Sequence, residues 1–139
     1  ETDRLAADLA HTFSATDRLH AFYALQRDWR LEPLELGNTI PGFGDVRSGR
    51  RQLLTLEYTR TAGPRWVNQV RGGLSRIAFD AQPNAAVAPS DYGLDTGGHA
   101  TPALPVFNIA GAFNLGGPPN LPQARTDTTV LASDDGFSW

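Results

Sequence analysis

The chain of 139 residues carries 12 basic and 15 acidic side chains, a net charge of −3 that excludes the basic excess typical of nucleic-acid-binding proteins. It contains no cysteine, which excludes disulfide bonds and thiolate metal sites. Its 14 glycines and 10 prolines predict many turns and few helices.

The first two segments with strand character predict a hairpin. In residues 3–13 and 18–29, the apolar side chains share one face with period 2: Leu5, Ala7, Leu9 and Phe13, then Leu19, Ala21, Tyr23 and Leu25. The second segment also fits an amphipathic helix, because Leu19, Phe22, Tyr23 and Gln26 fall at helical spacing. We favour a strand, because its neighbours are strands and Ser14-Ala15-Thr16-Asp17 is typical of a hairpin turn.

Three further segments alternate with the same period. In residues 52–62 and 66–79, the apolar face holds Leu54, Leu56, Tyr58 and Ala62, then Trp66, Val70, Gly72, Leu74 and Ala78. The opposite face holds Thr55, Glu57, Thr59 and Thr61, then Gln69, Arg71, Gly73 and Ser75. A fifth segment, roughly residues 125–139, alternates more weakly. Each of the three is predicted to be a strand.

Short and long connections alternate along the chain. About four residues, near 14–17, join the first two segments, and about three, near 62–64, join the third and fourth. The other two connections are long and rich in Pro and Gly, at about 30–49 and about 80–124. Compact soluble domains seldom hold structureless loops of this length, so the pattern argues against a simple soluble fold.

A transmembrane β-barrel has this arrangement, with short periplasmic turns, long extracellular loops and strands of about ten residues that cross the bilayer at a tilt. We therefore predict an all-β chain, an antiparallel meander of about five strands that is part of a larger transmembrane β-barrel. The pattern alone leaves open a soluble β-sandwich that binds carbohydrate or protein, its apolar faces packed together. A surface or adhesion fragment without a transport role is a third alternative.

Four stretches of the chain, taken in order, resemble Oar-like TonB-dependent outer-membrane receptors. They are "HTFSATDRLHAFYALQ", "IPGFGD", "LTLEYTRTAGPRWVNQVRGGLSRI" and "PVFNIAGAFNLGGPPNLPQARTDTTVLASDDGFSW". The third stretch keeps the family pattern at Thr59, Thr61, Pro64, Val67, Asn68, Arg71, Gly73, Arg76 and Ile77. The fourth keeps it at Gly111, Leu115, Gly116, Pro122, Gln123, Arg125, Thr128, Asp135 and Trp139.

The resemblance implies a fragment of the barrel region of a bacterial outer-membrane transporter. Its parent would import a scarce or large solute with energy relayed by the TonB complex. The implied partners are outer-membrane lipid, the rest of the barrel and its plug, the TonB complex and an unknown solute, with no nucleic acid. Plug and TonB-box residues are not carried over, because the resemblance covers barrel segments only.

The residue patterns predict neither catalysis nor a cofactor. The stretch from Gly42 to Gly49 lacks the spacing of G-x-G-x-x-G and of a P-loop, and "GGLSR" lacks the second glycine of a nucleophile elbow. The acids Asp91, Asp95, Asp134 and Asp135 are expected to be solvated. His11, His20 and His99 have no metal-ligand spacing. We therefore expect no enzyme, no cofactor and no metal.

Five arginines lie on or beside the third and fourth segments: Arg50, Arg51, Arg60, Arg65 and Arg71. They could form a basic ladder in the barrel lumen that binds an anionic ligand. We favour the alternative, in which water solvates them in the lumen or they lie near lipid headgroups. Arg60 is on the same face as Leu56 and Tyr58. Because it lies two residues before the turn, we predict that it is at the membrane–water interface. A lipid-facing arginine costs almost no free energy at that depth.

The long connection at about 80–124 is expected on the extracellular side, where a solute would arrive. Its aromatic and amide side chains suit stacking on, and hydrogen bonding to, a neutral solute such as a glycan. The candidate ligand-binding residues are Tyr92, His99, Phe113 and Asn114. We favour the structural alternative, in which Phe107, Ile109 and Phe113 alternate because they pair as a short extra strand.

Overall fold

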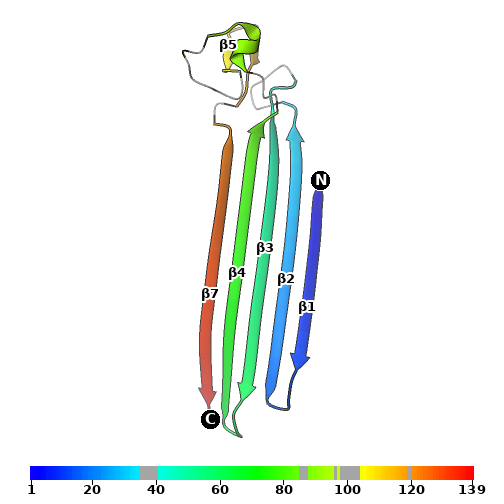
Figure 1. Cartoon of the computed structure of the whole chain (residues 1–139), viewed down its shortest axis with the longest axis vertical. Helices are drawn as coiled ribbons and strands as arrows, with labels where there is room; N and C mark the ends of the chain where they lie inside the picture. The colour runs from blue at the N-terminus through cyan, green and yellow to red at the C-terminus, as the bar shows by residue number, and fades with distance from the viewer. Residues whose placement is uncertain (35–40, 85–87, 96, 98–103, 119) are drawn as a thin grey trace. The chain divides into compact units, whose positions relative to one another are not determined.

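The computed structural model describes residues 1–34, 41–84, 88–95, 97, 104–118 and 120–139 (Figure 1). Its elements, in chain order, are β1 (Thr2–Thr12), β2 (Asp17–Glu32), β3 (Asp45–Thr61), β4 (Trp66–Pro83), the 3-10 helix η1 (Pro89–Tyr92), β5 (Phe107–Ile109), β6 (Phe113–Leu115) and β7 (Gln123–Ser138).

The five long strands form one sheet in the order β1-β2-β3-β4-β7, and Figure 1 shows them side by side from blue to orange. The predicted antiparallel meander of five strands, part of a barrel, is confirmed. The short strands β5 and β6 form a separate antiparallel pair in which Phe107 lies opposite Leu115 and Ile109 lies opposite Phe113.

The strands extend further than the sequence pattern indicated, so the expected long loops at 30–49 and 80–124 are too wide. Strand β2 continues to Glu32, β3 begins at Asp45, and β4 continues to Pro83. These added ends carry charged residues in place of apolar alternation, and ion pairs satisfy them: Arg30 with Glu32, and Arg47 with Asp45. Backbone pairing between strands does not require apolar side chains, which is why the periodicity failed to detect it.

The chain divides into two compact units. One holds Glu1 with residues 28–49 and 79–125, and the other holds residues 2–27, 50–78 and 126–139, which we call the strand unit. In the first unit, Ala81 and Leu104 are buried, with exposed fractions of 2% and 8%. In the strand unit the large apolar side chains are open instead, as at Leu9 (65%), Leu56 (44%) and Val130 (71%). The sheet of the strand unit therefore has no core of its own on its apolar side.

The two faces of the strand unit are fixed by contacts between neighbouring strands. On the polar face, Arg71 contacts Glu57 and Asp135, and His20 contacts Asp8. Side chains alternate along each strand, so the apolar face holds Leu5, Leu9, Leu54, Leu56, Val70, Leu74 and Val130. These are the faces that the period-2 pattern predicted. Contacts on the apolar face join Tyr23 to Gln52, Tyr58 to Asp17, and Asn68 to Asp134.

Candidate functional site

A charged network on the polar face joins three strands of the strand unit. Arg71 donates from Nε to Glu57 Oε2 at 3.1 Å and from Nη2 to Gln69 Oε1 at 2.5 Å. Its Nη1 lies 3.6 Å from Asp135 Oδ2. The network thus connects β3, β4 and β7. In water, partly exposed pairs of this kind are each worth about 0.2–1 kcal/mol, so they orient side chains more than they stabilise the sheet.

A second polar pair and a glycine border the network. His20 Nε2 lies 3.1 Å from both oxygens of the Asp8 carboxylate, which joins β1 to β2. At Gly73 a built Cβ would lie 3.8 Å from Leu131 Cβ and 3.9 Å from Leu54 O, which is ordinary van der Waals contact, so a small side chain would fit there. A shallow hollow lies there, lined by His20, Thr55, Glu57, Arg71, Gly73 and Ser133. The hollow presents hydrogen-bond donors and acceptors on the polar face of the sheet.

Asp17, the first residue of β2, collects hydrogen bonds at the short turn after β1. Its carboxylate accepts from Ser14 Oγ at 2.6 Å, Thr16 Oγ1 at 2.8 Å and Tyr58 Oη at 2.5 Å. The hydroxyl of Ser14 contributes most, followed by those of Tyr58 and Thr16, and together they lower the pKa of Asp17 to about 2. The turn is thereby held by three hydrogen bonds to one carboxylate.

The five arginines considered as a possible ladder do not share one face of the sheet. Arg51 and Arg71 line hollows on the polar face, whereas alternation places Arg50 and Arg60 on the apolar face. Arg65 lies in the turn between β3 and β4. Arg60 Nε is 3.9 Å from Asp17 Oδ1, beside the short turn. A single ladder of five in the lumen is therefore wrong.

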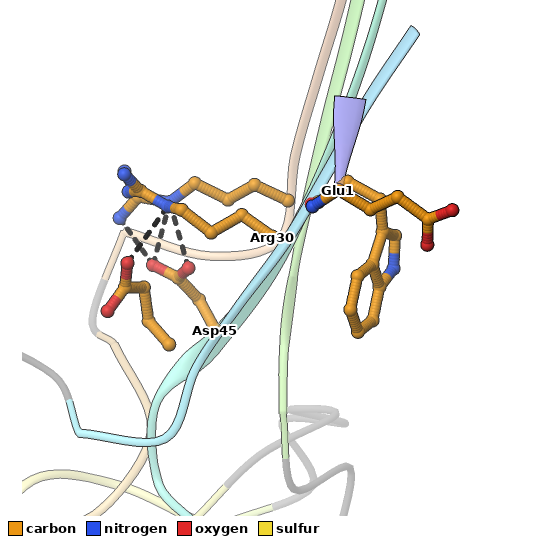
Figure 2. A network of polar contacts seen from close by, with 6 residues as sticks. Glu1, Arg30 and Asp45 are labelled. Carbon is orange, nitrogen blue, oxygen red and sulfur yellow. Dashed lines mark hydrogen bonds and ion pairs between the residues drawn. The ribbon is translucent and has the colours of Figure 1, made fainter. Parts of the chain in front are cut away.

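Outside the strand unit, the start of β3 carries a buried carboxylate. Asp45 is 3% exposed, and its two oxygens accept from Arg47 Nε at 2.8 Å and 2.9 Å. In Figure 2 the side chains of Arg30 and Asp45 extend toward the same point, and Arg30 Nε lies 2.9 Å from Glu32 Oε1. On the neighbouring backbone, the nitrogen of Glu1 donates to Trp29 O at 2.7 Å. These contacts belong to the strand ends and bring no two of the candidate ligand-binding residues together.

The four candidate ligand-binding residues occupy different elements. Tyr92 is the last residue of η1 and is 65% exposed, while Phe113 and Asn114 belong to β6. Phe113 pairs with Ile109 across the β5–β6 hairpin, which agrees with the structural alternative of a short extra strand. His99 lies outside the described residues. None of Tyr92, Phe113 and Asn114 lines either of the two hollows found on the polar face of the described strands.

Within the residues that the structure describes, no cluster of three or more His, Cys, Asp or Glu could hold a metal ion. A helix with the length and apolar character to cross a membrane is not found among those residues either.

A sheet with an exposed apolar face, a charged opposite face and alternating short and long connections defines a segment of a transmembrane β-barrel. The chain belongs to the outer membrane beta barrel domain family, whose model matches residues 1–139. Its location is accordingly the bacterial outer membrane. No curated protein and no solved structure matches the chain significantly.

Two features of the strand unit were not predicted from the sequence. One is the set of hydrogen bonds around Asp17, which depends on Tyr58 from a strand that is distant in the sequence. The other is a group of three arginines on the apolar face, Arg27, Arg50 and Arg76. Strand alternation would have found this group, because each falls on the same parity as the apolar residues of its strand.

Proposed function

We propose that this chain is part of the barrel of a TonB-dependent transporter of the Oar-like type, which imports a large or scarce solute. The barrel segment would line the lumen with its polar face and contact lipid with its apolar face. Energy for import would be relayed by the TonB complex to a plug inside the barrel, and neither a cofactor nor an enzymatic step is involved.

The observation that carries the proposal is the contact between Arg71 and Asp135. These two residues keep the family pattern in two separate stretches of the resemblance, and their side chains meet at 3.6 Å on the polar face. Matching positions in two separate stretches of sequence would not by themselves require the two side chains to be in contact. The resemblance to these receptors thus extends to residues that act together on the face that would meet the plug.

The hollow beside Arg71 supports the same proposal. Its lining combines charged and hydroxyl side chains with the apolar side chains of Leu131 and Ala132, and Gly73 contributes no side chain to it. A plug loop can place hydrogen-bonding groups there without displacing a bulky side chain.

The test uses the gene and the whole protein that it encodes. We expect a plug domain and a TonB box upstream of the region that encodes this chain, and more hairpins downstream. The purified whole protein should bind the periplasmic domain of TonB from the same bacterium, and loss of the TonB box should abolish binding. A gene without plug or TonB box would refute the transporter and leave a barrel of another class.

A further inference from the structure

Three arginines emerge close together on the apolar face of the strand unit. Gln26, Arg51, Ser75 and Ile77 line a common hollow on the polar face, on strands β2, β3 and β4. The residues next to them in sequence, Arg27, Arg50 and Arg76, therefore emerge together on the opposite face, because side chains alternate. We call these three the arginine row.

No residue in the described part of the chain forms an ion pair with the arginine row. All three side chains are exposed, and none forms a hydrogen bond or an ion pair with another described residue. Elsewhere in this unit, Arg71 pairs with Glu57 and His20 pairs with Asp8. Like charges on neighbouring strands repel each other, so three unpaired arginines on adjacent strands favour an anionic partner from outside the chain.

The spacing along the strands places the row at the level of lipid headgroups. Arg27 follows Asp17 by ten residues on β2, and Arg50 precedes Arg60 by ten on β3. About 9–11 tilted residues take a strand across the hydrocarbon core. Asp17 and Arg60 form a charged pair at one end of this interval, and the arginine row lies at the other end.

The interval between these two levels is free of charge on the apolar face of β2, β3 and β4. Its side chains are Leu19, Ala21, Tyr23 and Leu25 on β2, Gln52, Leu54, Leu56 and Tyr58 on β3, and Asn68, Val70, Gly72 and Leu74 on β4. An arginine within this band would cost about 2–4 kcal/mol at the midplane, but almost nothing at its border. The row thus lies where guanidinium groups reach phosphates.

We propose that Arg27, Arg50 and Arg76 form a binding site for the phosphate groups of anionic lipid headgroups in the leaflet on that side of the membrane. A guanidinium donates two parallel hydrogen bonds to a phosphate, which an ammonium cannot do with the same geometry. Three of them on adjacent strands can hold a phosphate monoester from more than one side. The proposal is independent of transport, since it concerns the outside of the barrel.

The test measures lipid binding to the whole barrel protein in detergent by native mass spectrometry. Phosphatidic acid and phosphatidylcholine with the same acyl chains are titrated separately. We expect tighter binding of phosphatidic acid to the unaltered protein. The variant with Arg27→Gln, Arg50→Gln and Arg76→Gln should lose at least about fivefold in affinity for it, the change expected for the loss of even one arginine near a membrane surface.

The matched control removes the same charge from the polar face. The variant with Arg4→Gln, Arg18→Gln and Arg51→Gln alters three exposed arginines there and should bind phosphatidic acid as the unaltered protein does. Equal losses in both variants, or none in the first, would overturn the proposal. Displacement of the lipid by inorganic phosphate at equal concentration would show a site for free phosphate instead.

The proposal can still be tested if the triple variant does not fold. Heat-modifiable migration on gels reports whether each variant forms a closed barrel. If the triple variant does not, Arg50→Gln alone is titrated, and the same fivefold loss is expected because Arg50 is on the central strand of the row. Unchanged affinity in this folded single variant would overturn the proposal.

Discussion

The hydroxyl of Tyr58 donates a 2.5 Å hydrogen bond to Asp17, and this bond ties the middle strand β3 to the turn that begins β2. The same carboxylate lies 3.9 Å from Arg60, which is also on β3. The carboxylate of Asp17 thereby joins the turn to strand β3 at the membrane border. The pKa of this carboxylate can be tested directly.

We expect Ser14→Ala to raise the pKa of Asp17, because the Ser14 hydroxyl contributes most to its low value of about 2. Since the folded-state pKa lies below the reference value of 3.8, this carboxylate stabilises the fold above pH 3.8 and ceases to do so as the pH falls through 2. Carbon-detected NMR titration of labelled aspartate in the whole barrel measures the pKa. Ser90→Ala, at an exposed position of η1, should leave the pKa of Asp17 unchanged.

The faces of the strands can be mapped by spin labels in the whole protein in lipid. Labels at Leu54, Leu56, Val70 and Leu74 should be accessible to oxygen dissolved in the acyl chains. Labels at Thr55, Glu57, Gln69 and Arg71 should instead be accessible to an aqueous reagent or be shielded by the plug. Uniform accessibility along residues 53–58 would contradict a strand that spans the bilayer there.

The pair formed by Glu57 and Arg71 should show a small coupling energy. A double-mutant cycle with Glu57→Gln and Arg71→Gln should give about 0.2–1 kcal/mol in urea unfolding of the whole barrel, since both side chains are partly exposed. Thr55→Ala, on the same face, should not couple to Arg71→Gln. A coupling well above this range would mean that the lumen excludes water around the pair.

The isolated chain of 139 residues should aggregate or remain poorly ordered in water. Its apolar face is exposed at residues such as Leu9 and Val130, and strands β1 and β7 have free edges. Size-exclusion chromatography and a thermal melt measure this. A monodisperse monomer with a sharp melt would favour the soluble sandwich over the barrel segment.

Replacing loop residues separates a ligand site from a structural hairpin. Phe113→Ala removes the ring opposite Ile109, and we expect it to impair barrel assembly together with uptake. Asn114→Ala is measured alongside it. Tyr92→Ala removes a ring that is 65% exposed, so assembly should stay normal and only uptake should fall if the loop binds solute. Normal uptake in the Tyr92 and Asn114 variants would exclude these residues as ligand contacts.

The sequence predicted the sheet well because period-2 alternation reflects the environment of each face. Leu54 to Tyr58 and Gln69 to Ser75 lie on the faces that their parity indicated. The pattern missed the ends of β2 and β3, which belong to the sheet but carry charged side chains. These ends pair through their backbone, and the alternation of apolar and polar residues cannot detect such pairing. Contacts such as Tyr58 with Asp17 also escaped, because register between strands is not encoded in the periodicity of either one.

The lengths of the connections also set an order for assembly. The β1–β2 and β3–β4 hairpins close through a few residues each, held at Phe13 by its hydrogen bond to Asp17 O and at Ala62 by its bond to Trp66 O. Pairing β7 with β4 requires the ends of the long stretch from residue 84 to 122 to meet, which costs more loop entropy and slows the search. We therefore expect β7 to dock last, leaving the outer edge of β4 exposed to chaperones until it does.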